Sequence, residues 1–303
     1  MSERPPDLSV RGRFVRIARL AAEGYDFVDD PVETVDHLRA QGRRVDLFTF
    51  TQYLPNTTPR YDYPMEWDNV AAIRVSTFEH WRTRQVKDKT RNMLRRAERA
   101  GLIVRPVPFD NALVHGISAI YNESPTRQGR RFTHYGKNLE VVRRESATFL
   151  DRSVFLGAFV GENLVGFAKL VRARHQAGLM QIVAMFGHRD KAPTNALIAH
   201  AVNVCEQQRI PYLVYSRFSY GRQADPLRDF KRYNGFERFE IPRYYIPLTM
   251  VGRAALRLGL HRRHHAVRFA RLRAYVPEPI IEHARTIRAR WWARRAPRTT
   301  SRP

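Results

Sequence analysis

The sequence predicts an α+β fold in which a mixed, mostly antiparallel sheet is flanked by helices and followed by a basic helical C-terminal tail. Short segments rich in β-branched and aromatic residues alternate with segments of helical apolar spacing. The composition, with 43% hydrophobic and 11% aromatic residues in a chain of 303, is typical of globular proteins. The net charge of +24 is concentrated at the end, where residues 251–303 hold fourteen Arg against Glu278 and Glu282.

The first 80 residues predict a small α/β part. β-rich segments are bounded by loop residues, and one helical segment begins at Pro31 and stops at Gly42. Strands are expected at 13–20, 43–52 and 69–76, a helix at 31–42 and a loop at 54–64.

One long helix is expected over residues 78–101. Val86, Met93, Leu94 and Ala97 form its apolar stripe, and Gly101 supplies the stop. The other faces are largely Arg and Lys. They are either a solvated basic surface or a platform for phosphates, and the sequence leaves both interpretations open.

The segment "YNESPTRQGRRFTHYGK", residues 121–137, has no apolar period and many hydrogen-bonding side chains. Tyr121, Phe132 and Tyr135 argue against a linker, because aromatic residues are scarce where nothing packs. A short helix is expected after it, at 139–149. Three strands are then expected at 153–160, 164–174 and 179–188, with "GEN" as the first hairpin turn.

A helix opening at Pro193 or Thr194 should follow these strands. Its apolar face repeats at helical spacing through Leu197, Ile198, Ala201, Val202 and Cys205. Cys205, the single cysteine, is therefore interpreted as a buried core thiol and not as a nucleophile, and no disulfide can form. A strand at 211–218, a helix at 227–235 and a last strand at 236–248 complete the expected sheet.

The tail, 251–303, mixes Arg with Leu, Phe and Trp, which is typical of basic helices on anionic lipid or nucleic acid. His261, His264 and His265 have helical spacing but no carboxylate or Cys close by, so no metal is expected. The sequence shows no signal peptide and no apolar run long enough to span a bilayer. A cytoplasmic protein, peripheral at the inner membrane face through its tail, is expected, with no obligate protein partner.

Three motifs carry a family resemblance: "KTRNMLRRAERAGL", "RDKAPTNALIAHAV" and "DFKRYNGF". With the order of the elements, they resemble the GNAT acyl-CoA N-acyltransferase superfamily, and within it the Fem-type aminoacyltransferases, which carry two such modules in tandem. The resemblance implies three parts. Residues 1–80 would be a reduced first module, 81–250 the acyltransferase domain, and 251–303 the basic tail.

The resemblance also implies where an acyl donor binds. The donor's arm would pair with the strand that holds Gln181, Val183 and Met185, and its phosphates would sit at the start of the next helix. That start offers Arg189, Lys191, Thr194 and Asn195. Ala192 and Thr194 stand where the superfamily has glycine, and Pro193 lacks an N–H. The donor is therefore either acyl-CoA or, as in Fem-type ligases, aminoacyl-tRNA.

The motif "DFKRYNGF" implies a catalytic group. Many GNAT enzymes have a general-acid Tyr where this chain has Lys231, whereas the pair Phe230 and Lys231 resembles the Phe-Lys of Fem-type ligases. The ammonium would stabilise an oxyanion or bind acceptor phosphate, with Tyr233 as an alternative acid. An exposed lysine without a catalytic role is the other interpretation.

The segment 121–137 lies where family members build the acceptor pocket. Arg127, Gln128, Arg131 and Tyr135, together with Phe230, would then bind the acceptor, and His134 or Glu123 would accept its proton. An ordered loop without a substrate is the alternative. The function expected is an N-acyltransferase that transfers an acyl or aminoacyl group to an amine, such as a cell-envelope or polysaccharide precursor. The rival is a non-catalytic RNA- or membrane-binding protein of the same fold.

Overall fold

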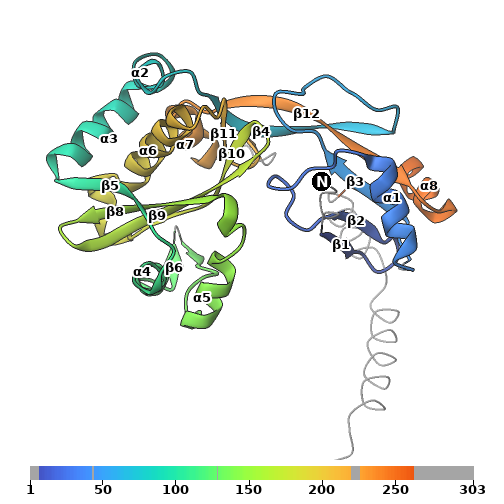
Figure 1. Ribbon diagram of the computed structural model, residues 1–303, viewed down its shortest axis with the longest axis horizontal. Coiled ribbons are helices and arrows are strands. Elements are labelled where there is room, and N and C mark those ends of the chain that lie inside the picture. The colour runs from blue at the N-terminus through green and yellow to red at the C-terminus, as the bar shows by residue number, and fades with distance from the viewer. Residues whose placement is uncertain (1–6, 43, 128, 220–225, 263–303) are drawn as a thin grey trace, which may run out of the picture.

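The computed structural model describes residues 7–42, 44–127, 129–219 and 226–262. A 10-stranded sheet runs through this part of the chain (Figure 1), in the order β1-β2-β3-β12-β4-β11-β10-β9-β8-β5. Its strands are β1 (Leu8–Arg11), β2 (Ile17–Leu20), β3 (Leu47–Thr51), β4 (Met65–Arg74), β5 (Leu102–Val107), β8 (Ser153–Val160), β9 (Asn163–Ala173), β10 (Gln176–Ala184), β11 (Tyr212–Val214) and β12 (Glu237–Pro247). Two short strands, β6 (Thr126–Arg127) and β7 (Arg130–Arg131), pair separately.

The helices of the described residues are mostly short. They are α1 (Pro31–Ala40), α2 (Phe78–His80), α3 (Asp88–Arg99), α4 (Asn111–Asn122), α5 (Leu139–Ser146), α6 (Pro193–Gln207), α7 (Pro226–Tyr233) and α8 (Met250–Arg257). A π-helical turn covers Trp81–Gln85, and 3-10 turns cover Leu150–Arg152 and Phe186–Lys191.

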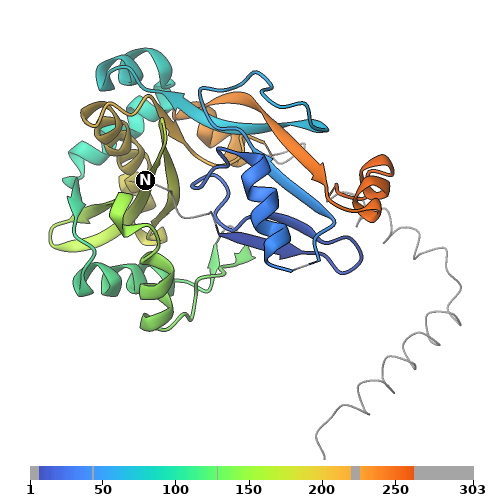
Figure 2. The same ribbon diagram turned by 45° about the vertical axis from the view of Figure 1, so that its right-hand side comes forward.

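The prediction of a mixed, mostly antiparallel sheet is confirmed. The pairs β2–β3 and β10–β11 are parallel, and the other neighbours in the sheet are antiparallel. Figures 1 and 2 show α3, α6 and α7 over one face of the C-terminal half of the sheet, with α4 and α5 over the other face. The result is a sheet covered by helices, as the alternation of patterns predicted.

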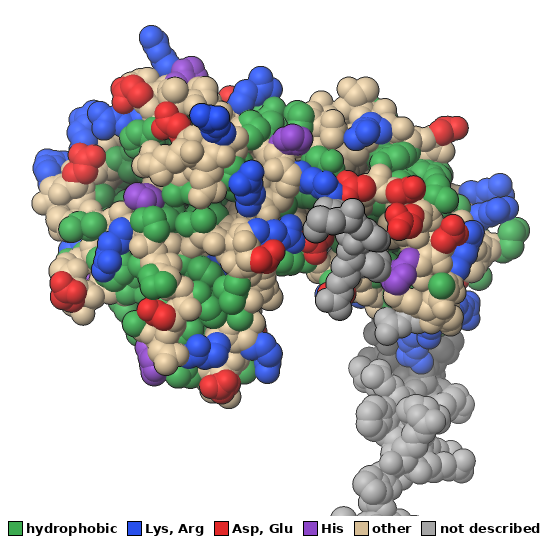
Figure 3. All heavy atoms as spheres, in the orientation of Figure 1, with side chains coloured by type: hydrophobic (Ala, Val, Ile, Leu, Met, Phe, Trp, Pro, Cys, Tyr) green, Lys and Arg blue, Asp and Glu red, His purple; other side chains and the backbone are tan. Residues whose placement is uncertain are grey.

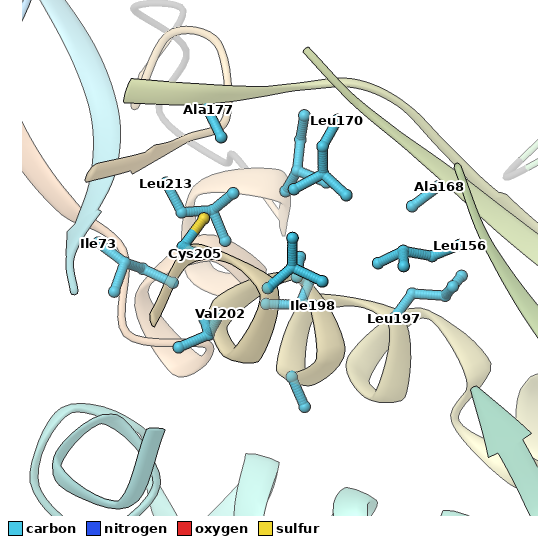
Figure 4. Packing of buried hydrophobic residues seen from close by; sticks show 14 of the residues in the cluster. Ile73, Leu156, Ala168, Leu170, Ala177, Leu197, Ile198, Val202, Cys205 and Leu213 are labelled. Atoms are coloured by element: carbon cyan, nitrogen blue, oxygen red, sulfur yellow. The ribbon is translucent and has the colours of Figure 1, made fainter. Parts of the chain in front are cut away.

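The main core lies between α6 and the sheet (Figure 4). Leu197, Ile198, Val202 and Cys205 point from the helix toward strand residues such as Leu170. All five residues of the predicted apolar face are buried. Burial raises the pKa of the Cys205 thiol to about 12, and the prediction of a buried core thiol is thus confirmed.

β12 joins the N-terminal part to the rest of the sheet. It pairs with β4 over Glu237–Tyr244 and with β3 over Arg243–Pro247. A second core, which includes Leu38, Phe48, Phe50 and Tyr244, lies under α1. The sheet is therefore continuous across residue 80, and the division into domains remains a prediction.

The prediction of a single helix over residues 78–101 is wrong. Val86 is extended, with a ψ of 149°, and separates the π-helical turn from α3. Tertiary contacts explain the break, because the Lys87 N–H donates to Tyr233 O at 3.1 Å and the buried Trp81 indole donates to Asn234 O at 3.0 Å. Packing against α7 overrides the local helical preference.

Among the strands and α-helices of the described residues, β1, β5, α4 and the short pair β6 and β7 were not predicted. The helix α4 does carry the pattern, since Leu113, Val114, Ile117 and Ile120 are buried at helical spacing. Of the tail, the structure describes α8 and the turn up to Arg262. The prediction for 263–303 lies outside the described residues.

Candidate functional site

The parallel strands β10 and β11 diverge after three residue pairs. Gln176–Gly178 pair with Tyr212–Val214, whereas β11 pairs with β4 along its other edge and its chain stays with β4 beyond Val214, where the Tyr215 N–H donates to Ala71 O. β10 continues to Ala184 paired only with β9, with a register shift at Leu179. Among the described residues, no strand pairs with the other edge of β10 beyond Gly178. This open edge is where the resemblance implies that the donor's arm binds.

Side chains reach both ends of this open edge. Because the Met185 N–H bonds to Val165 O on β9, the preceding carbonyl, that of Ala184, faces the open edge. Arg127 Nη1 donates to this oxygen at 2.6 Å, and Arg127 Nη2 donates to Ile120 O at 2.8 Å. At the other end, the Tyr25 hydroxyl donates to Leu179 O at 3.4 Å. Arg127 therefore lies at the predicted donor strand.

The three residues predicted on the donor strand differ in their surroundings. Val183 and Met185 pack against the aliphatic and aromatic cluster under α4. Gln181 is half-buried, and its Oε1 has no hydrogen-bond partner. The side chains of Val183 and Met185 thus belong to the core, which leaves their backbone groups to contact a ligand.

A cavity of 520 Å³ lies between α3, the start of α6 and α7, and we call it the helix-side cavity. It brings together Asn195, Phe230 and Tyr233 from the predicted site. Thr90 Oγ1 donates to Tyr233 O at 2.8 Å, and Asn195 Nδ2 donates to Asn234 Oδ1 at 2.9 Å. These bonds fix α3, α6 and α7 around the space. The full lining is Lys89, Thr90, Met93, Asn195, Pro226, Arg228, Asp229, Phe230, Tyr233 and Asn234.

The start of α6 has the backbone shape of a glycine turn without the glycine. Ala192 has a φ of 52°, in the left-handed region, and the N–H groups of Asn195 and Ala196 both donate to its carbonyl. Thr194 beside it is half-buried. The turn before α6 is therefore left-handed at position 192 although the residue there is alanine.

The two basic residues predicted near the donor phosphates have partners of their own. The Arg189 guanidinium lies 4.3 Å from the centroid of the Phe186 ring, and Lys191 Nζ lies 3.6 Å from an Asp190 oxygen. Arg189 is exposed and Lys191 is half-buried. Exposed contacts of this kind are weak, so they leave both cations able to meet a phosphate.

A second cavity, of 370 Å³, lies where the N-terminal part meets β4, β10, β11 and β12. We call it the central cavity. Its charged lining forms a chain of ion pairs: Arg243 Nη1 lies 2.7 Å from Glu23 Oε1, Arg243 Nη2 lies 2.9 Å from Asp68 Oδ2, and Arg217 Nη2 lies 2.7 Å from the same oxygen. Burial alone would lower the pKa of Arg243, but the carboxylates of Glu23 and Asp68 outweigh it and raise that pKa.

Sequence reasoning missed the central cavity. Glu23, Asp68, Arg217 and Arg243 come from separate segments, which meet only through the pairing of β4 with β11 and β12. The one available signal was a charged residue inside a strand pattern, such as Arg243 in "FEIPRYYI". A charge at an inward strand position marks a special environment.

Lys231 is not among the residues that line either cavity, but it contacts or adjoins residues that line each of them. It is fully buried, its Nζ donates to Arg217 O at 2.5 Å, and its ammonium lies 4.7 Å from the centroid of the Tyr215 ring. Arg217 lines the central cavity, whereas Phe230 and Asn234 on either side of Lys231 line the helix-side cavity. The interpretation of Lys231 as an exposed surface lysine is therefore wrong.

The segment 121–137 is ordered where the structure describes it, but its contacts go elsewhere. The Glu123 carboxylate accepts from the N–H groups of Phe186 at 2.6 Å and of Gly187 at 2.8 Å. It thus caps the 3-10 turn before α6. Arg131 and Tyr135 are exposed, and Gln128 lies outside the described residues.

His134 belongs to a separate cluster between α4 and α5. Its ring stacks on Tyr121 at 4.4 Å, and its Nδ1 lies 3.0 Å from Lys137 Nζ, which also contacts Glu145 at 2.5 Å. Burial, and then the nearby ammonium of Lys137, lower the pKa of His134. The contacts of His134 and Glu123 do not reach Lys231 or the lining of the central cavity.

No group of three or more His, Cys, Asp or Glu residues within the described ranges is arranged to hold a metal ion. His264 and His265 lie outside those ranges. Among the helices that the structure describes, none combines the length and the apolar character needed to cross a bilayer.

No family model and no curated protein matches this sequence. Similar solved structures do exist. The C-terminal domain of a protein assigned as a lysylphosphatidylglycerol synthetase from Agrobacterium fabrum has a TM-score of 0.52 at 14% identity, covering 82% of each chain. FemX has a TM-score of 0.52 at 9% identity, covering 78% of this chain and 83% of its own. L-PGS from Bacillus licheniformis has a TM-score of 0.51 at 14% identity, covering 78% of this chain and 80% of its own. These matches show that the chain shares the fold of these proteins, the GNAT/Fem-like fold that its sequence motifs resemble.

Proposed function

We propose that this protein transfers an acyl or aminoacyl group from a phosphate-bearing donor to an amine acceptor. The observation that carries the proposal is the position of Lys231, which is fully buried beside Tyr215 and Arg217 at the end of β11 and adjoins residues that line each cavity. The helix-side cavity, with Asn195, Phe230 and Tyr233 in its wall, would hold one end of the donor, whose arm would follow the open edge of β10. The central cavity would hold the acceptor.

The chemistry follows from the charges. Attack by a neutral amine on the acyl carbonyl produces a tetrahedral oxyanion, and the Lys231 ammonium is the fixed positive charge that would stabilise it. As the intermediate collapses, the bond from the acyl carbon to the donor breaks, the tRNA hydroxyl or coenzyme A thiol leaves, and the amine gives up a proton. Glu23 lines the central cavity, is 23% exposed and pairs there with Arg243, one arginine against the two at Asp68, so it is the better candidate to accept the proton. Asp68 Oδ2 already meets both Arg217 and Arg243.

Aminoacyl-tRNA is the donor that the observations favour over acyl-CoA. At the start of α6, Pro193 lacks an N–H, and the N–H groups of Ala192, Asn195 and Ala196 already donate to backbone carbonyls, so few backbone donors are left for a pyrophosphate. FemX and the lysylphosphatidylglycerol synthetase domain are also among the similar structures. For the acceptor, the carboxylates of the central cavity suit an amine, and a cell-envelope precursor is the class that the Fem-type resemblance implies.

Donor binding tests the proposal. Aminoacyl-tRNA, acetyl-CoA and a longer acyl-CoA are each titrated while thermal stability is followed. A ligand at 100 times its Kd adds about 2.7 kcal/mol of stability. Met93→Trp narrows the helix-side cavity, and Val70→Trp, the matched control, narrows the central cavity.

One donor should stabilise the wild type and Val70→Trp but not Met93→Trp. Stabilisation by none of the donors would instead favour the rival, a non-catalytic RNA- or membrane-binding protein with this fold. Stabilisation that persists in Met93→Trp would place the donor outside the helix-side cavity.

A further inference from the structure

α8 presents three different faces. Its inner face packs on the sheet so closely that a Cβ at Gly252 would lie 1.9 Å from Asp46 O. Arg253 and Arg257 are exposed on a second face. The third face is apolar and also exposed: Met250, Ala254 and Leu258 repeat at i, i+4 and i+8, and Val251 adjoins them. In a helix that only covered a core, the exposed faces would be polar.

The exposed fractions are large for apolar side chains: 74% for Met250, 67% for Leu258 and 40% for Val251. Phe14, in the loop between β1 and β2, is 83% exposed. Single exposed apolar residues are ordinary, whereas a group of them on one helix face and an adjacent loop marks an interaction surface.

One buried carboxylate joins the Phe14 loop to the start of α8. Asp46 Oδ2 accepts from the Arg16 N–H at 2.9 Å, and Asp46 Oδ1 accepts from Thr249 Oγ1 at 2.8 Å. Phe14 is two residues from Arg16, and Met250 is next to Thr249. Both therefore lie at the same end of the molecule. Figure 3 shows hydrophobic and basic side chains projecting there, at the right-hand end where Figure 1 shows α8.

The two segments that carry these apolar side chains are basic, although two carboxylates lie close by: Asp46 accepts from the Arg16 N–H and Thr249, and Glu66 pairs with Arg262. Residues 8–17 and 249–262 contain six Arg and neither Asp nor Glu. We call the α8 surface the group Phe14, Met250, Val251 and Leu258 with the exposed Arg11, Arg13, Arg253 and Arg257. We propose that the α8 surface docks on an anionic lipid bilayer, with its apolar side chains at the level of the headgroups and its arginines among the phosphates.

A bilayer fits both halves of this surface. Nucleic acid would pair with the arginines but leave four apolar side chains in water, and a symmetric contact between two copies would bring arginines against arginines. Residues 263–303, which follow directly, hold eleven further Arg together with Trp291 and Trp292. Each basic residue near an anionic membrane contributes about 1 kcal/mol, so this sequence adds to the same attraction. The inference does not depend on the proposed transferase activity.

A fluorescent reporter on the full chain tests the docking. Cys205 is fully buried, so Leu258→Cys provides one reactive thiol for an environment-sensitive dye. The matched control is Ile103→Cys, which is 61% exposed on β5, at the opposite edge of the sheet from β1. Both labelled proteins are mixed with phosphatidylcholine vesicles with and without phosphatidylglycerol, and with tRNA.

Dye at position 258 should shift to shorter wavelength only with phosphatidylglycerol present, and dye at position 103 should not shift. Met250→Ser should weaken vesicle binding about five- to tenfold, because an apolar side chain that the bilayer would bury is lost. Ile103→Ser should leave vesicle binding unchanged. A protein that sediments with the vesicles without a shift at 258 would bind through 263–303 alone and overturn the proposal. A shift with tRNA, or one that grows with protein concentration in the absence of vesicles, would also overturn it.

Discussion

Among the described residues, Lys169 and Lys231 are fully buried, and the ammonium group of each donates to a backbone carbonyl. Lys231 donates to Arg217 O beside the cavities. Lys169, on β9, donates to Ser146 O at 2.8 Å, to Thr148 Oγ1 at 2.9 Å and to Thr148 O. A buried ammonium is costly unless it is hydrogen-bonded, which explains why each contacts a carbonyl. Lys169 thereby fixes the end of α5.

Lys169 makes stability depend on pH. Burial lowers the pKa of Lys169 from 10.5 to about 8. Between these values the unfolded chain binds more protons at this site than the folded chain, so the lysine's contribution to stability rises with pH over that interval. We expect the free energy of unfolding, measured in urea, to rise from pH 8 to pH 10 more steeply in the wild type than in Lys169→Met. Equal slopes would contradict the shift.

The turn between α7 and β12 links the helices that surround the helix-side cavity. Gly235 ends α7 with a φ of 83°, and a Cβ there would lie 3.1 Å from Trp81 Nε1. The preceding residue, Asn234, accepts from the Trp81 indole through its carbonyl and from Asn195 through its amide oxygen. The turn therefore fixes both the break before α3 and the wall of the helix-side cavity.

Gly235→Ala should be more destabilising than Gly161→Ala. Gly161, in the turn between β8 and β9, has a φ of 57° but no atom within 4 Å of a built Cβ, so alanine there should cost only backbone strain, about 1 kcal/mol. At Gly235, crowding against Trp81 is added, for a total of about 2 kcal/mol or more. Urea denaturation of the two variants measures this difference. An equal loss would show that Trp81 moves aside freely.

The spacing of apolar residues predicted the elements between residues 139 and 248 well, because the apolar residues of those segments follow regular helical or strand spacing. α6 carries a complete apolar face, and β8 and β9 are joined by a recognisable hairpin turn. The spacing of apolar residues failed to predict structure where contacts between distant segments determine the conformation. The break at Val86 depends on α7, and β12 reaches both β3 and β4.

The same reasoning explains what was found of the candidate site. Asn195, Phe230 and Tyr233 lie in motifs, and they meet in one cavity. The residue types in segment 121–137 suggested chemistry, but the contacts of Glu123 and Arg127 go to backbone groups around β10. The central cavity is assembled from charges far apart in the sequence, and no local spacing records their meeting.

For the whole molecule, the central claim is that Lys231 acts between a donor cavity and an acceptor cavity. Lys231→Met and Lys169→Met are matched variants, since each removes a fully buried ammonium that donates to backbone carbonyls. Each leaves carbonyl oxygens without a partner, at a cost of about 1–3 kcal/mol of stability. They differ in the bonds lost, since Lys169 donates to two carbonyls and a hydroxyl whereas Lys231 donates to Arg217 O, and in position, since Lys231 adjoins residues that line the cavities.

The most direct measurement is single-turnover transfer of a labelled acyl or aminoacyl group, from the donor that stabilises the protein, to a panel of primary amines. Lys231→Met should lower the rate about 100-fold, as the loss of an oxyanion donor does. Lys169→Met should keep a transfer rate near that of the wild type, although its melting temperature should be similar to that of Lys231→Met. Equal rates in the two variants, or no transfer by the wild type to any amine, would contradict the account.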